Sequence, residues 1–307
     1  MQNSFSESPL QKLEDELFHE KGIELYIKRD DLIHPHVQGN KWRKLKYNLQ
    51  QARNNKQHTL LTFGGAYSNH IYATAAAARQ FGFKAIGMIR GEEPAVKSAT
   101  LQFAAEQGME LHYMSRETYR QKEDTTIIEI LRMQMGEFYY VPEGGTNVFA
   151  LQGVAEIISE IEIDFDYICT ACGTGGTLAG LVAGLKGEKQ VLGFSSLKGE
   201  DRLSGKVHEL VEEYAGERFG DFSINFDYHF GGYAKVKPEL IQFIKDFHRN
   251  HAIRLEPVYT GKLFYGLFDL IQRDYFPKDA KIIALHTGGL QGLTGFPELA
   301  ELQNAKT

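Results

Sequence analysis

The chain has few of the features that identify membrane, secreted or nucleic-acid-binding proteins. Of its 307 residues two are cysteine, and no apolar run approaches the roughly 18 residues of a membrane span. The first residues, MQNSFSESPLQKLEDELF, lack the basic and apolar regions of a signal peptide. The formal net charge of −6 argues against a general nucleic-acid binder, which needs a basic face for phosphates. We therefore expect a cytoplasmic protein that binds neither membrane nor nucleic acid.

The two cysteines, Cys169 and Cys172, form a CxxC pattern within FDYICTACGTGG. No second Cys or His pair stands at zinc-finger spacing, and Cys169 lies in an apolar run that is typical of a buried strand. We expect neither a redox pair nor a metal site here, and no compact Asp, Glu and His cluster indicates a metal site elsewhere.

Apolar strand-like runs alternate with helix-like runs through most of the chain. This alternation is typical of βαβ units, and strands that are apolar throughout are expected where helices cover both faces of a sheet. Gly82 and Gly108 end two of the helix-like runs, as glycines after helix C-termini do. The strand-like runs are residues 58–63, 84–91, 109–114, 166–171 and 281–286, and the helix-like runs are 68–82, 95–108, 126–135 and 177–187.

The pattern predicts an α/β protein with two lobes, each a mostly parallel sheet flanked by helices. Residues 52–152 are expected to form a smaller inserted domain, and residues 1–51 plus 153–307 a larger one. The stretch 212–240 breaks the alternation and is expected to be irregular structure over a cleft. A cleft between two lobes is a common place for a small-molecule site.

The loop CGTGGTLAG, residues 172–180, follows a strand-like run and opens a helix-like run. Its glycines allow backbone N–H groups to converge on an anion at a helix N-terminus, and Thr174 and Thr177 add hydroxyl donors. It matches neither the Walker A spacing nor GxGxxG. A phosphate site and a tight turn without a ligand both fit this loop taken alone.

A second glycine turn, FGGAYSNHIYATAAAA, spans residues 63–78. Ser68 is a good helix N-cap, with Asn69 and His70 in the first turn. The three polar groups would suit a carboxylate, while a simple capping role explains Ser68 equally well.

Four stretches taken in order resemble the fold type II pyridoxal-phosphate (PLP) enzymes, the tryptophan-synthase-β-like group. KRDDL…GNKWRKL is similar to the cofactor-lysine motif, GGAYSNH to the substrate-carboxylate loop, CGTGGT to the phosphate loop and HTGG to the ring-nitrogen segment. Within the group, GNKWRKL, SNH, GGTN and EPVYTGK are most similar to the branch that holds 1-aminocyclopropane-1-carboxylate (ACC) deaminase and D-cysteine desulfhydrase. The resemblance implies PLP in the cleft, a small amino-acid substrate and a homodimer.

The resemblance also implies a role for individual residues. Lys41 would bond the cofactor covalently and move protons at the substrate Cα, and a dry pocket that lowers its pKa would suit that role. Arg43 and Lys46, beside it, are expected to be solvated. The implied catalytic residues are Lys41, Ser68, Tyr233 and Tyr259. The implied substrate-binding residues are Ser68, Asn69, His70, Tyr259 and Thr260, with Ser68 and His70 on the carboxylate. The implied cofactor-binding residues are Lys41, Lys44, Asn69, Gly173, Thr174, Gly175, Gly176, Thr177 and Thr287.

Two positions bear on the substrate. ACC deaminases usually have an acidic residue directly after the tyrosine of the PVY-GK motif and read HLGG near the end, whereas this chain has Thr260 and HTGG. Both departures resemble D-cysteine desulfhydrase, which we expect to be the activity, yielding pyruvate, sulfide and ammonia. ACC deamination to 2-oxobutyrate is the alternative, and a non-catalytic small-ligand binder on the same scaffold is a second alternative.

Overall fold

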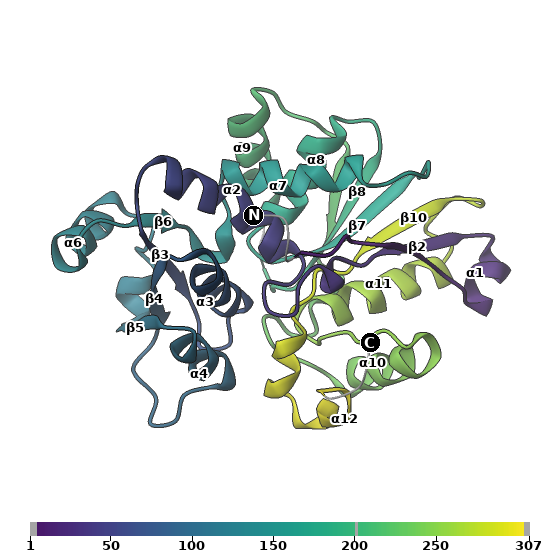
Figure 1. Cartoon of the computed structure of the whole chain (residues 1–307). Helices are drawn as coiled ribbons and strands as arrows, with labels where there is room; N and C mark the ends of the chain where they lie inside the picture. Colours follow the sequence, from purple (N-terminus) through teal and green to yellow (C-terminus); the bar gives the residue numbers. More distant parts are fainter. Residues whose placement is uncertain (1–4, 200–201, 304–307) are drawn as a thin grey trace.

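The computed structural model describes residues 5–199 and 202–303 and has two lobes, each built on a sheet flanked by helices (Figure 1). The predicted α/β class is confirmed. The larger sheet has the strand order β1-β2-β10-β7-β8-β9; β1 pairs antiparallel with β2, and the other neighbours pair parallel. Its strands are β1 (Leu10–Leu13), β2 (Glu24–Lys28), β7 (Tyr167–Cys172), β8 (Gln190–Ser195), β9 (Phe222–Asn225) and β10 (Lys281–Leu285).

The smaller sheet has the order β5-β4-β3-β6 and is parallel throughout. Its strands are β3 (Thr59–Gly64), β4 (Lys84–Arg90), β5 (Met109–Met114) and β6 (Tyr139–Val141). The α-helices of the chain are α1 (Glu16–Lys21), α2 (Asn40–Asn54), α3 (Asn69–Phe81), α4 (Ala99–Glu106), α5 (Arg116–Tyr119), α6 (Thr125–Met135), α7 (Val148–Ser159), α8 (Gly176–Leu185), α9 (Leu203–Ala215), α10 (Pro238–His251), α11 (Thr260–Gln272) and α12 (Ala300–Gln303).

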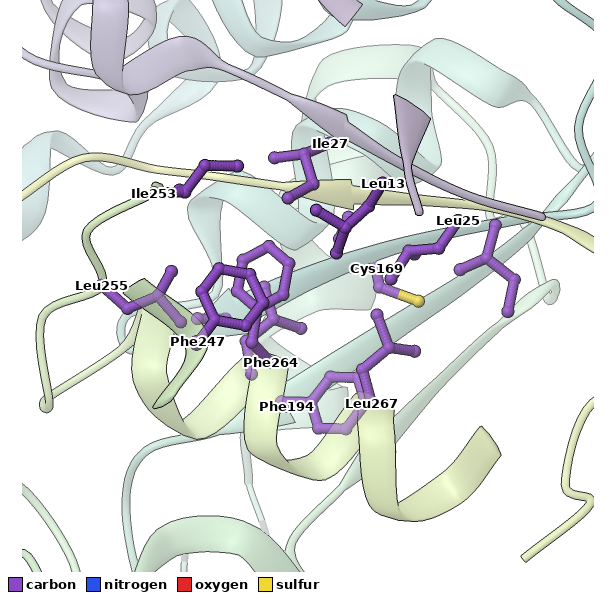
Figure 2. Close-up of a cluster of buried hydrophobic side chains, with 14 of the residues drawn as sticks. Leu13, Leu25, Ile27, Cys169, Phe194, Phe247, Ile253, Leu255, Phe264 and Leu267 are labelled. Atoms are coloured by element: carbon purple, nitrogen blue, oxygen red, sulfur yellow. The ribbon is translucent and has the colours of Figure 1, made fainter. Parts of the chain in front are cut away.

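The larger sheet is buried on both faces because its strands are apolar at successive positions. In β10, Ile282 and Ala284 join a core with α10 and α11, whereas Ile283 and Leu285 join a second core with α7, α8 and α9. Figure 2 shows the first of these cores, including Phe264 and Leu267 of α11. Successive side chains of a strand point to opposite faces, so the apolar run predicts this double burial.

The same alternation explains the two cysteines. Cys169 packs into the core with α10 and α11, whereas Cys172, three residues on, packs into the core on the opposite face. Both are buried and free. Side chains three positions apart in a strand point away from each other, so this CxxC can neither form a disulfide nor chelate one ion.

Some elements differ from the expectation. The stretch 212–240, expected to be irregular, contains the end of α9, the strand β9, the 3-10 helix η3 (Asp227–His229) and the start of α10, and its remaining loop carries Tyr233 to the cavity described below. The predicted domain boundaries at 52 and 152 fall within α2 and α7 and stay a proposal. Within residues 5–199 and 202–303, no helix is both long enough and apolar enough to cross a membrane.

Candidate active site

A cavity of about 580 Å³ lies between the lobes and is lined by the loops that follow β2, β3, β6, β7 and β10. These loops meet because carboxyl ends of parallel strands lie at one edge of a sheet, where ligands of α/β proteins bind. The lining includes most residues proposed from the sequence: Lys41, Lys44, Ser68, Asn69, His70, Gly173, Thr174, Gly175, Thr177, Tyr233, Tyr259 and Thr287. Gly176 and Thr260 do not line it.

The backbone before α2 places Lys41 in the cavity wall. Gly39, at φ 55° and ψ −134°, is the N-cap of α2, and a Cβ at Gly39 would overlap the backbone carbonyl of Thr287. Both the positive φ and this close approach require glycine. The segment after β2 therefore packs directly on the segment after β10, and Lys41 follows in the first turn of α2.

The side-chain amine of Lys41 has no hydrogen-bond partner within the described chain. Burial lowers its pKa to about 8, against the opposing charge of Glu143. A substantial fraction of this amine is therefore neutral just above neutral pH, which is the form that attacks a carbonyl carbon.

Lys44 lies one turn further along α2 and is buried, 2 % exposed. Its amine donates to the backbone carbonyl of Gly144 at 3.3 Å and to the hydroxyl of Thr146 at 3.2 Å. Burial and the nearby charge of Lys41 hold the pKa of Lys44 well below its usual value. An anion beside Lys44 would offset both effects.

Arg43 is buried, so the prediction that it is solvated is wrong. Its guanidinium donates to both carboxylate oxygens of Asp30, at 3.2 and 2.9 Å, and to Glu160 at 2.8 Å. Lys46 is partly exposed and pairs with Glu156 at 2.7 Å. Arg43 and Lys46 hold α2 on neighbouring elements and do not line the cavity.

The loop after β7 leads directly into α8. Gly175 has φ 84°, a backbone conformation that favours glycine, and α8 begins at Gly176. The hydroxyl of Thr174 shares a hydrogen bond with Thr146 at 2.6 Å, and that of Thr177 accepts one from the side-chain amide of Asn40 at 2.9 Å. The loop thus combines a helix N-terminus, two hydroxyls and the buried amine of Lys44, a set that suits a phosphate.

These features fit PLP. The phosphate would meet the α8 N-terminus and Lys44, and the carbonyl carbon of the cofactor would meet the unpartnered amine of Lys41. A cavity of about 580 Å³ also lies in the range of small-molecule sites.

Ser68 caps α3, as the sequence predicts. Its hydroxyl oxygen accepts from the backbone N–H groups of His70 and Ile71 at 3.2 and 3.3 Å, which leaves its own proton free to donate into the cavity. The Asn69 side-chain oxygen accepts from the amide of Gln291 at 2.6 Å. Ser68 and Asn69, which both line the cavity, therefore keep the hydroxyl proton and the side-chain amide N–H groups available as donors at the start of α3.

His70 is 2 % exposed, and its Nε2 lies 2.8 Å from the hydroxyl of Thr62. Its Nδ1 is buried without a partner. Burial and the charges of Lys41 and Lys44 hold the pKa of His70 well below its usual value, so the ring is neutral.

Two tyrosines stand over the cavity. The rings of Tyr233 and Tyr259 meet edge to face at 6.1 Å, and Tyr233 is 41 % exposed. Burial, with the neighbouring Tyr233 and Glu256, raises the pKa of Tyr259 well above its usual value. Both phenols are therefore protonated near neutral pH and can donate.

Thr260 lies behind the cavity wall rather than on it, contrary to its predicted place among the substrate-binding residues. It is fully buried, and its hydroxyl accepts from the backbone N–H of Glu256 at 3.0 Å. The Glu256 carboxylate in turn accepts the N–H groups of Val258, Tyr259 and Thr260, at 2.7, 2.8 and 2.6 Å, and so caps the start of α11.

Thr287 lines the cavity after β10, and the resemblance implies that this residue faces a ring nitrogen. The next residues are held by Gln38, whose side-chain oxygen accepts the N–H groups of Gly289 and Leu290 at 3.1 and 3.2 Å. Sequence reasoning missed Gln38, Gln291 and Glu143, all of which line the cavity. The position of Gln38 directly before GNKWRKL is a local signal that could have found it.

No group of three or more His, Cys, Asp or Glu residues in the described part of the chain could hold a metal ion.

Comparisons with known proteins agree with this geometry. A family profile described as "Pyridoxal-phosphate dependent enzyme" matches residues 2–288. A putative ACC deaminase of Pyrococcus horikoshii is 35 % identical over 298 residues, covering 93 % of this chain and 90 % of that protein. A bifunctional D-cysteine desulfhydrase/ACC deaminase of Arabidopsis thaliana is 32 % identical over 300 residues, covering 89 % and 74 %. A crystal structure of an ACC deaminase homologue superposes with a TM-score of 0.85 at 32 % identity, covering 97 % and 94 %.

Proposed function

The chain belongs to the pyridoxal-phosphate dependent enzyme family and is a PLP-dependent lyase or deaminase, and from this premise we propose that its substrate is D-cysteine. The products are pyruvate, sulfide and ammonia. Membership of an enzyme family, together with Lys41 in the cavity, favours catalysis over the non-catalytic binder.

Groups from both lobes would hold the cofactor. Backbone N–H groups at the start of α8 and the amine of Lys44 would hold the phosphate, and Thr287, which lines the cavity, would bind the pyridine nitrogen. Asn69, which Gln291 orients, would bind the ring from the smaller lobe.

Bound PLP withdraws electrons from the substrate Cα and so makes its proton acidic. Lys41 would hold the cofactor through its amine, and in its neutral form this amine would remove the proton from the substrate Cα. The Ser68 hydroxyl donates to the substrate carboxylate at the N-terminus of α3. Tyr259 donates a proton to the departing sulfur.

The observation that carries the choice of D-cysteine is the protonation of Tyr259. ACC has no α-hydrogen, so its ring must be opened with a nucleophile and additional acid–base groups. A buried phenol with a raised pKa stays protonated near neutral pH, so it is a poor nucleophile there but still carries a proton that it can share with a departing β-sulfur. The acidic residue in the described lining, Glu143, is already bonded to Tyr119 at 2.7 Å and to Lys122 at 3.3 Å.

The test is to assay pyruvate from D-cysteine and 2-oxobutyrate from ACC side by side with the PLP-loaded protein, using Lys41→Ala as the inactive control. We expect pyruvate formation with D-cysteine and little 2-oxobutyrate. Turnover of ACC alone would overturn the proposed substrate and support the alternative, ACC deamination, which the name of the relative at 35 % identity favours.

A homodimer and a cytoplasmic location stay predictions from the sequence. Light scattering coupled to size-exclusion chromatography measures the first directly.

A further inference from the structure

The ring of His70 is attached to the smaller sheet through a single hydroxyl. The Thr62 oxygen lies 2.8 Å from Nε2 of His70 and 2.8 Å from the backbone carbonyl oxygen of Val141. Thr62 is fully buried in β3, and His70 is 2 % exposed at the start of α3. Water therefore does not compete for either contact.

The three groups allow one assignment of protons that uses both contacts. A hydroxyl has one proton and a carbonyl oxygen only accepts, so the Thr62 proton goes to Val141. The Thr62 oxygen must then accept a proton from His70, which places the ring proton on Nε2. The opposite tautomer would leave the Val141 contact unused and bury a donor on Nδ1 without an acceptor.

The remaining nitrogen, Nδ1, is thus a bare acceptor. It is buried without a partner in a residue that lines the cavity, next to the backbone of Gly145. A bare acceptor repels a carboxylate and attracts an N–H donor. Two amines from α2 lie near the ring; that of Lys44 is already engaged with Gly144 and Thr146, whereas that of Lys41 is not.

We propose that His70 is a neutral hydrogen-bond acceptor for an amine in the cavity, and that Thr62 is the positioning residue that holds it in this tautomer. The donor is the amine of Lys41 or the amino group of the incoming amino acid. His70 then orients a proton carrier instead of binding the substrate carboxylate, which is left to Ser68 and the start of α3. The proposal rests on the proposed function only in requiring an amino-acid substrate.

The tautomer is read by nitrogen NMR of cofactor-free protein labelled with [15N]histidine, with His70 assigned by its loss in His70→Gln. We expect a protonated Nε2 and an unprotonated Nδ1. A protonated Nδ1 in the wild-type protein would overturn the proposal. The NMR measurement does not depend on turnover, so it tests the tautomer of His70 whether or not D-cysteine is the substrate.

Two variants of Thr62 form a matched pair. Thr62→Val keeps the shape but removes the hydroxyl, and we expect mixed tautomers and a loss of about tenfold in kcat/KM, the effect of one orienting hydrogen bond. Thr62→Ser keeps the hydroxyl and should restore the wild-type spectrum. Both should bind PLP with a Kd within about twofold of wild type, measured by absorbance titration. An unchanged His70 spectrum in a folded Thr62→Val protein would contradict the positioning role.

The source of the amine is distinguished by two comparisons of the His70 Nδ1 signal. A shift between cofactor-free wild type and Lys41→Ala identifies Lys41 as the donor. A shift only when D-alanine, which lacks a β leaving group, is added to the PLP-loaded wild type identifies the substrate amino group. No shift in either comparison would overturn the acceptor role.

Discussion

At the residue scale, burial decides what the two cavity lysines can do. Both have lowered pKa values, but the amine of Lys44 donates to Gly144 and Thr146, whereas that of Lys41 is unpartnered in the described chain. Lys44 is therefore oriented to hold an anion, and Lys41 is the amine available to attack a carbonyl. The two lysines are one helical turn apart and both have lowered pKa values, so their hydrogen bonding, and not their charge, distinguishes their roles.

The buried amine of Lys41 destabilises the cofactor-free protein at neutral pH. Its pKa falls from 10.5 to about 8 on folding, which corresponds to about 3 kcal/mol below pH 8. Between pH 8 and 10.5 the unfolded chain binds more protons than the folded chain, so wild-type stability from this group rises with pH. We expect cofactor-free Lys41→Met to exceed wild type by about 3 kcal/mol at pH 7, with the difference shrinking toward pH 10.

Urea unfolding of both proteins at pH 7 and pH 10 measures this difference. Lys84→Met, at an exposed position of β4, is the control and should show little change at either pH. A stability gain for Lys41→Met that is equal at the two pH values would contradict the assigned cause.

At the element scale, the loops after the parallel strands position the site, and the contact of Gly39 with the segment after β10 is the tightest of them. Gly39→Ala and Gly108→Ala are a matched pair, because both residues have positive φ, 55° and 89°, but a Cβ at Gly108 would meet nothing within 4 Å. We expect Gly108→Ala to cost about 1–2 kcal/mol from backbone strain alone. Gly39→Ala should cost more and also weaken PLP binding at least tenfold.

Thermal unfolding and absorbance titration with PLP separate these two effects. Equal stability losses and equal PLP affinities in the two variants would show that the packing of Gly39 on Thr287 does not shape the site.

A second feature at the element scale is a pair of hydrogen bonds that holds the loop carrying Tyr233. The buried amine of Lys262, in α11, donates to the backbone carbonyls of His229 and Gly232 at 2.9 and 2.8 Å. We expect Lys262→Met to loosen residues 229–233 because both carbonyls lose their donor. Hydrogen exchange of this segment should become faster and KM should rise several-fold, whereas the exposed Lys237→Met should change neither.

Local signals explain how much of this organisation the sequence predicts. The glycine turns and the Ser68 cap predict the loops of the cavity because a few neighbouring residues determine each turn. The prediction that Arg43 is solvated is wrong because its partners, Asp30 and Glu160, lie 13 and 117 residues away along the chain, where a local pattern does not show them. Thr260 does not line the cavity for a different reason: its backbone N–H and its hydroxyl bond to Glu256, four residues earlier, in the cap of α11. The strand β9, Phe222–Asn225, has four residues, too few for a periodic signal.

At the scale of the whole molecule, α2 and α7 connect the lobes and pack on each other. A Cβ at Gly153 of α7 would overlap the backbone carbonyl of Arg43, so the two helices approach closely. Arg43 to Glu160 and Lys46 to Glu156 join the same helices through ion pairs. Lys41 thus lies on the helix that links the smaller sheet, whose loops supply Ser68 to His70, to the larger sheet, whose loops supply residues 173–177 and Thr287.

The most direct test of this arrangement is to reduce the PLP-loaded protein with borohydride and to locate the cofactor by peptide mass spectrometry. Among the residues that the structure describes, four lysines line the cavity, Lys41, Lys44, Lys122 and Lys206, so the measurement distinguishes among four candidate amines. We expect the added mass on Lys41 and its absence from Lys41→Ala treated in the same way. Cofactor fixed on Lys44 or Lys206 in the wild-type protein would contradict the assignment of the catalytic lysine.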